Sequence, residues 1–430
     1  MKLNRLFVLI ALFLSACVLE AEDHSGVIKV EIVPHGSGYQ LLRGGKPYEI
    51  KGAGLNDGDI VSFVAHGGNS IRNWGTHNAQ EVLDLAHQYG VTVALCLGVD
   101  SERHDFDYND EVAVAEQLQR LREEVIKYRN HPALLAWIIG NELNFDYTNS
   151  AVYDAVNDIS KMIHELDPNH PTTTTVAGLG QNVLDDLLNR APDLDILSFQ
   201  AYGQLAMLPE FIPAEGVGKP LWITEWGSIG HWEVPRTDWG APIEMTSSEK
   251  ARVYQEGPGN YILPLGSQVI GNYAFLWGWK QEKTSTWFGL FTETGKETEA
   301  IDVLHRQWNG TWPENRAPLL QSMQLDSKSA AQNVVLEPGN TYQAVVEVQD
   351  PDGDKLSYRW ELKPESTDDQ VGGDFEAAIK NLEGAIVDHG GASTSLVAPR
   401  EPGAYRLFVY AYDSDNNAAH ANIPFYVSEP

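Results

Sequence analysis

The feature that most constrains the fold of this 430-residue chain is a repeated alternation of short apolar runs with longer amphipathic segments. This alternation is typical of parallel sheets, because each strand is connected to the next by a helix. The runs of strand length are 48–55, 69–75, 91–98, 134–142, 172–178, 194–203, 221–227 and 272–280. Eight such repeats match a closed (β/α)₈ barrel in number and size, whereas a doubly wound sheet rarely needs eight strands.

The segments between these runs have the spacing of amphipathic helices. Residues 109–128 place apolar side chains three or four positions apart, and Asn109 or Asp110 can cap this helix. Segments 78–90 and 151–166 repeat the pattern. Thr246 with Glu249 has the spacing of a capping box, which predicts the start of the helix before the eighth strand.

The composition changes at 312–321, a proline-containing linker without helical periodicity. Short alternating strands follow, separated by clusters of Asp, Gly and Pro; they are 341–348, 356–362, 404–412 and 422–427. We therefore expect a barrel at 28–314 and a small all-β immunoglobulin-like sandwich at 315–430. The plainer interpretation of the sandwich is a spacer, and carbohydrate binding is an alternative.

The first residues, "MKLNRLFVLIALFLSAC", combine basic residues with an apolar run that is too short to span a bilayer. "LSAC" resembles a bacterial lipobox, which implies that 1–17 is a lipoprotein signal peptide with Cys17 lipidated, followed by a tether at 18–27. This predicts an exported lipoprotein of the bacterial cell envelope, in the outer membrane or facing the periplasm. A plain secretory signal is the alternative. Cys96 lies in an apolar run and is expected to be a small core residue.

The formal charge is −30 and the pI is near 4.7. Nucleic acid and anionic membrane surfaces would be repelled, so the only membrane contact that we expect is the lipid at Cys17. A neutral substrate fits this charge, although acidity can also serve solubility alone. Neither a cofactor nor an oligomeric state is indicated by the sequence.

Two glutamates end apolar runs of the predicted barrel. Glu142 follows Asn141 at the end of the fourth run, and Glu225 lies at the end of the seventh. In a barrel the carboxyl ends of the strands form the active site, so both carboxylates should project into one mouth. A retaining glycosidase requires two carboxylates about 5 to 5.5 Å apart. The pair therefore points to the cleavage of glycosidic bonds.

Four segments resemble glycoside hydrolases of clan A, and most of all the family 2 TIM-barrel domain without its usual N-terminal domains. They are "NSIRNWG" (69–75), "HPALLAWIIGNE" (131–142), "ITEWG" (223–227) and "FLWGWK" (275–280). The resemblance implies that Glu142 is the acid/base and Glu225 the nucleophile. The His-Pro that often follows the second-strand Arg in family 2 is missing here, so a galactosidase or glucuronidase specificity is not carried over.

Neighbouring residues have predicted supporting roles. Arg72 can hold Glu225 ionised, with a structural ion pair as the alternative. Asn141 can bond the sugar 2-hydroxyl, and Tyr202 can bond the nucleophile or be an aromatic of the rim. Trp74, Trp232 and Trp277 are among the tryptophans expected near the mouth, where aromatic faces pack on sugars, with Trp277 as the floor of the central subsite.

Two further sets of residues have weaker signals. Arg103 and His104 belong to "SERHDFDYNDE" (101–111), which resembles a substrate-facing loop and can line an outer subsite, whereas a metal site there is disfavoured. Asp350, Asp352 and Asp354 form an acidic turn; calcium is an alternative there, but we expect no metal because Asp-Gly turns are common without one.

Together these patterns predict a retaining β-glycoside hydrolase that acts on a neutral, glucan-like β-linked oligosaccharide or polysaccharide. A β-glucan transglycosylase would use the same residues. A non-catalytic carbohydrate-binding lipoprotein is the alternative from another class, although pure binding has no need of two facing glutamates.

Overall fold

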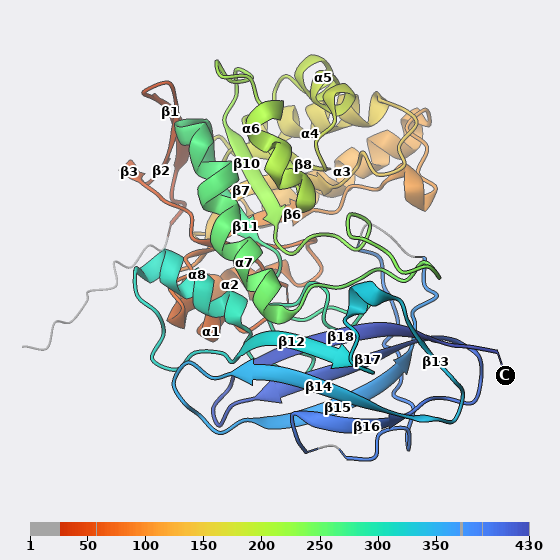
Figure 1. Ribbon diagram of the computed structural model, residues 1–430. Helices are drawn as coiled ribbons and strands as arrows, with labels where there is room; N and C mark the ends of the chain where they lie inside the picture. Colours follow the sequence, from red (N-terminus) through yellow and green to blue (C-terminus); the bar gives the residue numbers. More distant parts are fainter. Residues whose placement is uncertain (1–25, 57, 370–372, 389, 430) are drawn as a thin grey trace, which may run out of the picture.

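The computed structural model describes residues 26–56, 58–369, 373–388 and 390–429. The predicted signal peptide with Cys17 and most of the predicted tether lie outside the described residues. The described chain forms a barrel followed by two small sheets. In Figure 1 the barrel lies at one end of the molecule and the two sheets lie together at the other. Within the described ranges, no helix is both long enough and apolar enough to span a membrane.

The barrel is closed and all its strands run parallel, as predicted. Its strands are β4 (Gly52–Gly54), β5 (Ser70–Arg72), β6 (Thr92–Leu97), β7 (Leu134–Asn141), β8 (Thr172–Ala177), β9 (Leu197–Gln200), β10 (Leu221–Trp226) and β11 (Val269–Ala274). Each of the eight predicted runs contains part of one strand. The strand β4 closes the barrel against β11, where a Cβ atom on Gly52 would lie 2.6 Å from the carbonyl oxygen of Asn272. Glycine is therefore required at this close approach.

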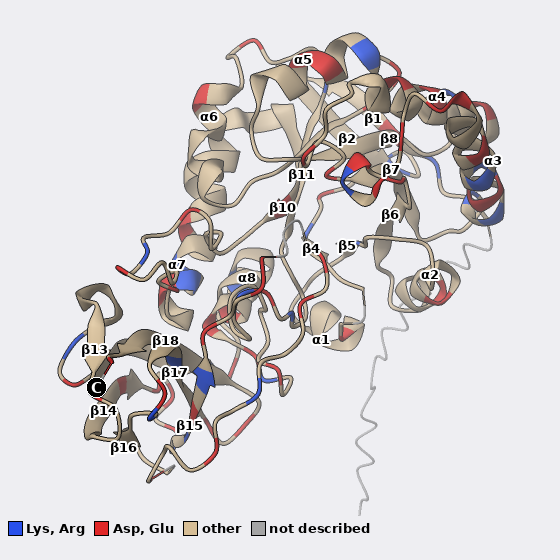
Figure 2. Ribbon diagram, turned by 90° about the vertical axis from the view of Figure 1, so that its right-hand side faces the viewer, with Lys and Arg blue, Asp and Glu red and all other residues tan. Residues whose placement is uncertain are grey.

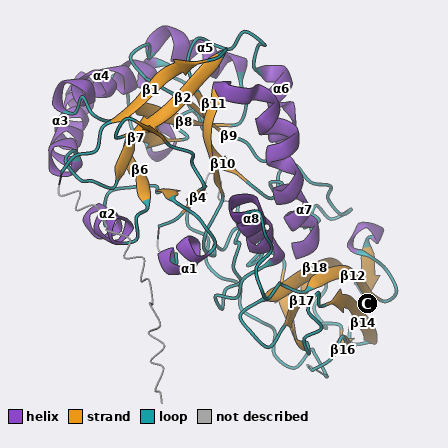
Figure 3. Cartoon of the chain, turned by 90° about the vertical axis from the view of Figure 1, so that its left-hand side faces the viewer, coloured by secondary structure: helices purple, strands orange, loops and turns teal. Residues whose placement is uncertain are grey.

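The helices around the barrel are α1 (Ile60–Ala65), α2 (Ala79–Gln88), α3 (Glu111–Tyr128), α4 (Ala151–Leu166), α5 (Gln181–Arg190), α6 (Leu208–Phe211), α7 (Ser247–Gly257) and α8 (Glu299–Asn309). Figure 3 shows them as the outer layer, with the strands inside. Asp110 caps α3 by accepting the backbone N–H groups of Val112 and Ala113 at 3.0 and 3.1 Å. The predicted capping box of Thr246 and Glu249 is present at α7.

One strand boundary differs from the prediction. The eighth strand was expected at 272–280, but β11 begins at Val269 and ends at Ala274. The "WGWK" sequence therefore lies in the loop after the strand, where it borders the barrel mouth. The apolar tryptophans extend the run in the sequence, because composition does not distinguish a strand from a buried loop.

An antiparallel hairpin at the start of the described chain was not predicted from the sequence. It consists of β1 (Val30–His35), β2 (Gly38–Arg43) and the short β3 (Lys46–Pro47). Val30 and Leu41 are buried in one apolar cluster with barrel residues such as Cys96 and Trp222. The backbone of Val30 and the side chain of Arg43 bond the carbonyls of Asn169 and Pro132, which precede β8 and β7. The hairpin thus closes the amino end of the barrel, opposite the predicted active site.

The two C-terminal sheets face each other as a sandwich, which confirms the predicted fold class. One sheet contains β12 (Leu319–Leu325), β14 (Thr341–Gln349) and β16 (Ser393–Val397). The other contains β13 (Val334–Leu336), β18 (Ala418–Val427), β17 (Gly403–Tyr412) and β15 (Ser357–Pro364). The sheets bury a shared apolar core in which Trp360, Leu396 and Phe425 take part.

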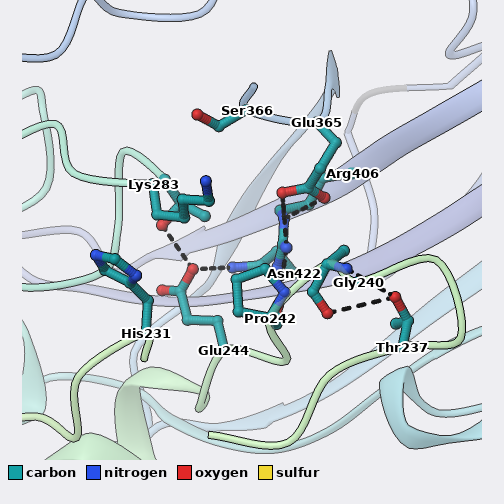
Figure 4. Close-up of polar contacts among 12 residues, drawn as sticks. His231, Thr237, Gly240, Pro242, Glu244, Lys283, Glu365, Ser366, Arg406 and Asn422 are labelled. Carbon is teal, nitrogen blue, oxygen red and sulfur yellow. Dashed lines mark hydrogen bonds and ion pairs between the residues drawn. The ribbon is translucent and has the colours of Figure 1, made fainter. Parts of the chain in front are cut away.

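The sandwich packs directly on the barrel. The helix α7 contacts β12 and β18, and Figure 4 shows a polar cluster at this junction. Arg406 of β17 is 1% exposed, forms an ion pair with Glu365 at 2.9 Å and donates to the carbonyl of Pro242 at 2.8 Å. Asn422 of β18 donates to Glu244 at 2.6 Å. The sandwich therefore contacts the barrel through buried charged and polar side chains.

Candidate active site

A cavity of about 820 Å³ opens at the carboxyl ends of the barrel strands. Its lining includes Asn141 and Glu142 at the end of β7, Gln200 of β9 and Glu225 of β10, together with residues from the loops after β6 and β11. This volume lies in the upper part of the range for small-molecule sites. The two predicted catalytic glutamates therefore share one cavity.

Glu225 is 5% exposed and accepts hydrogen bonds from three side chains. Its Oε1 accepts from the Arg72 guanidinium, with which it forms an ion pair, and from Trp74 Nε1 at 2.8 Å. Its Oε2 accepts from the Tyr202 hydroxyl at 2.7 Å. All three donors stabilise the negative charge of the carboxylate and fix its orientation. Arg72 and Tyr202 thus lie in the contacts expected from the sequence, and Trp74 adds a bond that was not expected.

Glu142 occupies an unusual backbone conformation. Its φ is 51°, in the left-handed region that non-glycine residues rarely adopt, and its N–H donates to the carbonyl of Thr175 at 3.0 Å. Gly140, two residues earlier, has φ of 72°. The chain thus turns sharply as β7 ends, which brings the carboxylate to the cavity. Strained backbone of this kind is concentrated at functional sites.

The two carboxylates have different environments. Burial raises the pKa of Glu142 to about 8, and the negative charge of Glu225 adds to this rise against the opposing effects of Arg72 and Arg103. Glu142 therefore holds its proton at neutral pH, whereas Glu225 is surrounded by donors. Two carboxyl groups whose environments separate their protonation states can act as an acid and a nucleophile.

Asn141 is oriented by its neighbours. Its Oδ1 accepts from Arg72 Nη2 at 2.9 Å, from Gln200 Nε2 at 2.8 Å and from the Thr175 hydroxyl at 3.2 Å. Because the oxygen is held in this way, the amide NH₂ is the group that Asn141 can offer to a ligand in the cavity. Gln200 was not predicted, although it directly precedes the "AYG" at the end of the sixth run.

Tyr202 is a neutral donor. Burial, followed by the charges of Glu225 and Glu142, raises its pKa well above the ordinary value. The next residues are held by Glu233, whose carboxylate accepts the backbone N–H groups of Gly203 and Gln204 at 2.8 and 3.0 Å. Glu233 thereby fixes the loop that carries Tyr202.

The tryptophans behave differently from one another. Trp232 is 52% exposed, lines the cavity and packs edge-on against Tyr202, so its ring is available to a sugar. Trp277 borders the cavity, but its side chain is 0% exposed and stacks on Trp308 with ring centroids 5.8 Å apart. A fully buried ring cannot stack on a sugar, so Trp277 is a packing residue and the predicted floor is corrected.

Arg103 and His104 line the cavity as predicted, but both contact a residue of the sandwich. Asp374 lies 3.3 Å from Arg103 Nη2 and 3.4 Å from His104 Nε2. Lys280 and Glu282 also line the cavity and form an ion pair at 2.5 Å, although neither was predicted as a site residue. Lys280 belongs to the "WGWK" segment, whereas no local signal marks Asp374.

The carboxylates of the acidic turn in the sandwich accept backbone N–H groups. Asp350 Oδ1 accepts the backbone N–H groups of Asp352 and Asp354, both at 2.9 Å, and Asp352 Oδ2 accepts the N–H of Arg316 at 2.8 Å. Across the described part of the chain, no group of three or more His, Cys, Asp or Glu side chains is placed to hold a metal ion. These carboxylates hold the turn through bonds to backbone N–H groups.

Part of the barrel is similar to known proteins. Residues 54–230 match the family model described as "Glycosyl hydrolases family 2, TIM barrel domain". Human beta-glucuronidase is 25% identical over 181 residues, which are 38% of this chain and 26% of that protein. Mannan endo-1,4-beta-mannosidase F of Aspergillus clavatus is 30% identical over 129 residues, which are 24% of this chain and 30% of that protein.

Among solved structures, beta-glucuronidase 2 of Bacteroides uniformis matches with a TM-score of 0.50 and 12% identity over 93% of this chain and 48% of that chain. At this identity the likeness concerns the fold. The matches span less than half the length of each of these relatives.

Proposed function

We propose that this chain, whose barrel is a glycosyl hydrolase family 2-like TIM-barrel domain, is a retaining β-glycoside hydrolase. The observation that carries the proposal is the pair of glutamates in one cavity with opposite environments. Glu142 keeps its proton, and Glu225 is held as an anion by Arg72, Trp74 and Tyr202.

In the first step, a Glu225 oxygen attacks the anomeric carbon of the bound sugar. The bond from this carbon to the leaving oxygen breaks, and that oxygen takes the proton of Glu142. The negative charge of Glu225 disappears as the glycosyl ester forms. Because this charge raises the pKa of Glu142, its loss lowers that pKa, so the deprotonated Glu142 remains available as a base.

In the second step, Glu142 takes a proton from water as the water oxygen attacks the same anomeric carbon. The ester bond to Glu225 breaks, and the sugar leaves with its original configuration. The Asn141 amide, oriented by Arg72 and Gln200, is placed to donate to the sugar. Such a bond contributes most when it strengthens in the transition state.

The proposed substrate is a neutral β-linked glycan of the glucan type. Two features support this choice: the chain has a formal charge of −30, and Figure 2 shows acidic residues in both parts of the molecule. The cavity residues Lys280 and Arg103 are each paired with a carboxylate. A β-glucuronide is the second candidate, because glucuronidases are among the relatives. A transglycosylase, in which a sugar hydroxyl replaces water, would use the same two glutamates.

The test is hydrolysis of a panel of β-linked glucans, mannans, xylans and galactans by the purified protein, with NMR of the first product released. We expect a β-anomer. Glu225→Ala should abolish turnover, whereas Glu165→Ala on the outer surface of α4, 73% exposed, should leave the rate unchanged. An α-anomer would overturn the retaining mechanism, and full activity of Glu225→Ala would overturn the assignment of the nucleophile.

We also propose, from the "LSAC" sequence alone, that the protein is exported and anchored to the cell envelope by lipid at Cys17. Mass spectrometry of the mature protein should find a lipid-modified Cys17 at its N-terminus. An unmodified N-terminus after residue 17 would favour the plain secretory signal.

A further inference from the structure

The wall of the catalytic cavity is not made by the barrel alone. Gly373 and Asp374 line the same cavity as Glu142 and Glu225, yet they belong to the sandwich, in the segment between β15 and β16. The cavity is therefore completed by a segment more than 140 residues from Glu225 in the chain. A residue in such a position can affect which sugars enter.

This segment is fastened to the barrel loop that follows β11. Glu376 is 8% exposed, and its carboxylate accepts the backbone N–H of Lys283 at 2.5 Å, Gln281 Nε2 at 3.3 Å and the Ser366 hydroxyl at 2.8 Å. Lys283 Nζ donates to the carbonyl of Asp368 at 2.8 Å. The barrel loop held in this way also carries Lys280 and Glu282, which line the cavity. Residues before and after Asp374 in the chain, Asp368 and Glu376, therefore both bond the barrel loop that follows β11.

Asp374 is the partner of basic side chains in this wall. Its carboxylate lies 3.3 Å from Arg103 Nη2 and 3.4 Å from His104 Nε2. Arg103 is held from another side by Phe145, whose ring centre lies 5.5 Å from the guanidinium carbon. Asp374 thus places a negative charge beside the guanidinium of Arg103 at the cavity wall. Arginine is the side chain that binds carboxylates best, through parallel hydrogen bonds.

We propose that Asp374 is a specificity-determining residue, which offsets the charge of Arg103 and so makes the cavity select neutral sugars over sugars that carry a carboxylate. This inference rests on the proposed function for the identity of the ligand as a sugar. A carboxylate on the ligand would compete with Asp374 for Arg103 and would meet the negative charge of Asp374 itself. A neutral sugar meets neither obstacle.

The test measures binding rather than turnover, by titrating the purified full chain with D-glucuronate and with D-glucose and following tryptophan fluorescence at low ionic strength. We expect the native protein to bind D-glucuronate no more tightly than D-glucose. Asp374→Asn should bind D-glucuronate about tenfold more tightly than the native protein does, while its affinity for D-glucose changes less than twofold. The gain should shrink as salt is added, because the interaction is between charges.

Two further variants separate this role from a structural one. Asp369→Asn removes the same charge from an exposed position of the same segment, and it should show no gain. The double variant Arg103→Gln with Asp374→Asn should lose the gain, because the cation is then gone. Thermal unfolding of each variant checks that it is folded.

The inference is overturned if Asp374→Asn shows no gain in D-glucuronate affinity, including the case in which no binding is detected, or if the native protein prefers D-glucuronate. It is also overturned if Asp369→Asn shows the same gain. Binding can be measured without catalysis. If the protein hydrolyses no glycoside but Asp374→Asn still binds D-glucuronate more tightly, the proposed hydrolase activity is refuted and the role of Asp374 in specificity stands. If the protein is an active hydrolase but Asp374→Asn binds D-glucuronate no more tightly, only the role of Asp374 in specificity is refuted.

Discussion

At the scale of single residues, the proposed chemistry depends on how the surroundings of two similar side chains differ. Glu142 directly follows β7, Glu225 is the next-to-last residue of β10, and both line one cavity. Glu225 receives three hydrogen bonds, whereas burial and the charge of Glu225 keep Glu142 protonated. The two environments suit different tasks, because a general acid must hold its proton and a nucleophilic carboxylate must have lost it.

The pH dependence of the reaction follows from this difference. The pKa of Glu142 is raised to about 8, and the protonated form is the active one in the first step. Activity should therefore persist through neutral pH and fall as the pH rises through about 8. The measurement is kcat/KM between pH 5 and pH 10 on an activated aryl glycoside. In Glu142→Gln the alkaline fall should disappear, and a native profile without a fall above pH 7 would contradict the role of Glu142.

At the scale of elements, α7 connects the two parts of the molecule. It begins next to Glu244, packs on β12 and β18, and precedes β11, which contacts the hairpin strand β2. Its first turn is closed by the capping box, in which Thr246 and Glu249 each bond the other's backbone N–H, at 3.2 and 2.8 Å. Capping satisfies donors that the helix itself leaves unpaired.

Replacing Thr246 by Ala should remove one of these bonds. We expect the free energy of unfolding to fall by about 1 kcal/mol, the usual cost of a lost N-cap. Asn78 occupies the same position at α2 but makes no capping bond, so Asn78→Ala is the matched control and should cost less. Chemical denaturation of both variants gives the comparison. Equal losses would show that the capping box contributes nothing beyond the bare N-cap position.

At the scale of the whole molecule, buried charges hold the sandwich against the barrel. The side chain of Glu244 is 0% exposed, forms an ion pair with Lys250 at 2.5 Å and accepts from Asn422 of the sandwich at 2.6 Å. The same sandwich carries Asp374 to the cavity that Glu142 and Glu225 line. The junction therefore stabilises the fold and also positions part of the site.

Removing Lys250 should show how much this junction contributes. Lys250→Met leaves Glu244 buried without its cation, and we expect a loss of about 3 to 5 kcal/mol in the free energy of unfolding. Lys29→Met breaks an exposed ion pair with Glu31, in which Lys29 is 55% exposed, and should cost at most about 1 kcal/mol. Urea denaturation measures both. A loss for Lys250→Met as small as that for Lys29→Met would contradict a structural role of the junction.

The sequence by itself determined the barrel, because hydrophobic periodicity is local and each strand and helix carries its own pattern. It also placed Glu142 and Glu225 together, since the carboxyl ends of parallel strands must meet at one face of a barrel. The contacts of Arg72 and Tyr202 with Glu225 follow from the same rule. The run predicted at 134–142 matches β7, which ends in Asn141 at the cavity.

Only the tertiary structure decided what depends on contacts between distant segments. The hairpin of β1 and β2 gains its apolar partners at the amino end of the barrel, and Trp277 is buried by Phe63 and Trp308 rather than exposed to a ligand. Asp374 meets Arg103 across 271 positions of the chain. No local pattern encodes such pairs, because the two partners become neighbours only when the whole chain has folded.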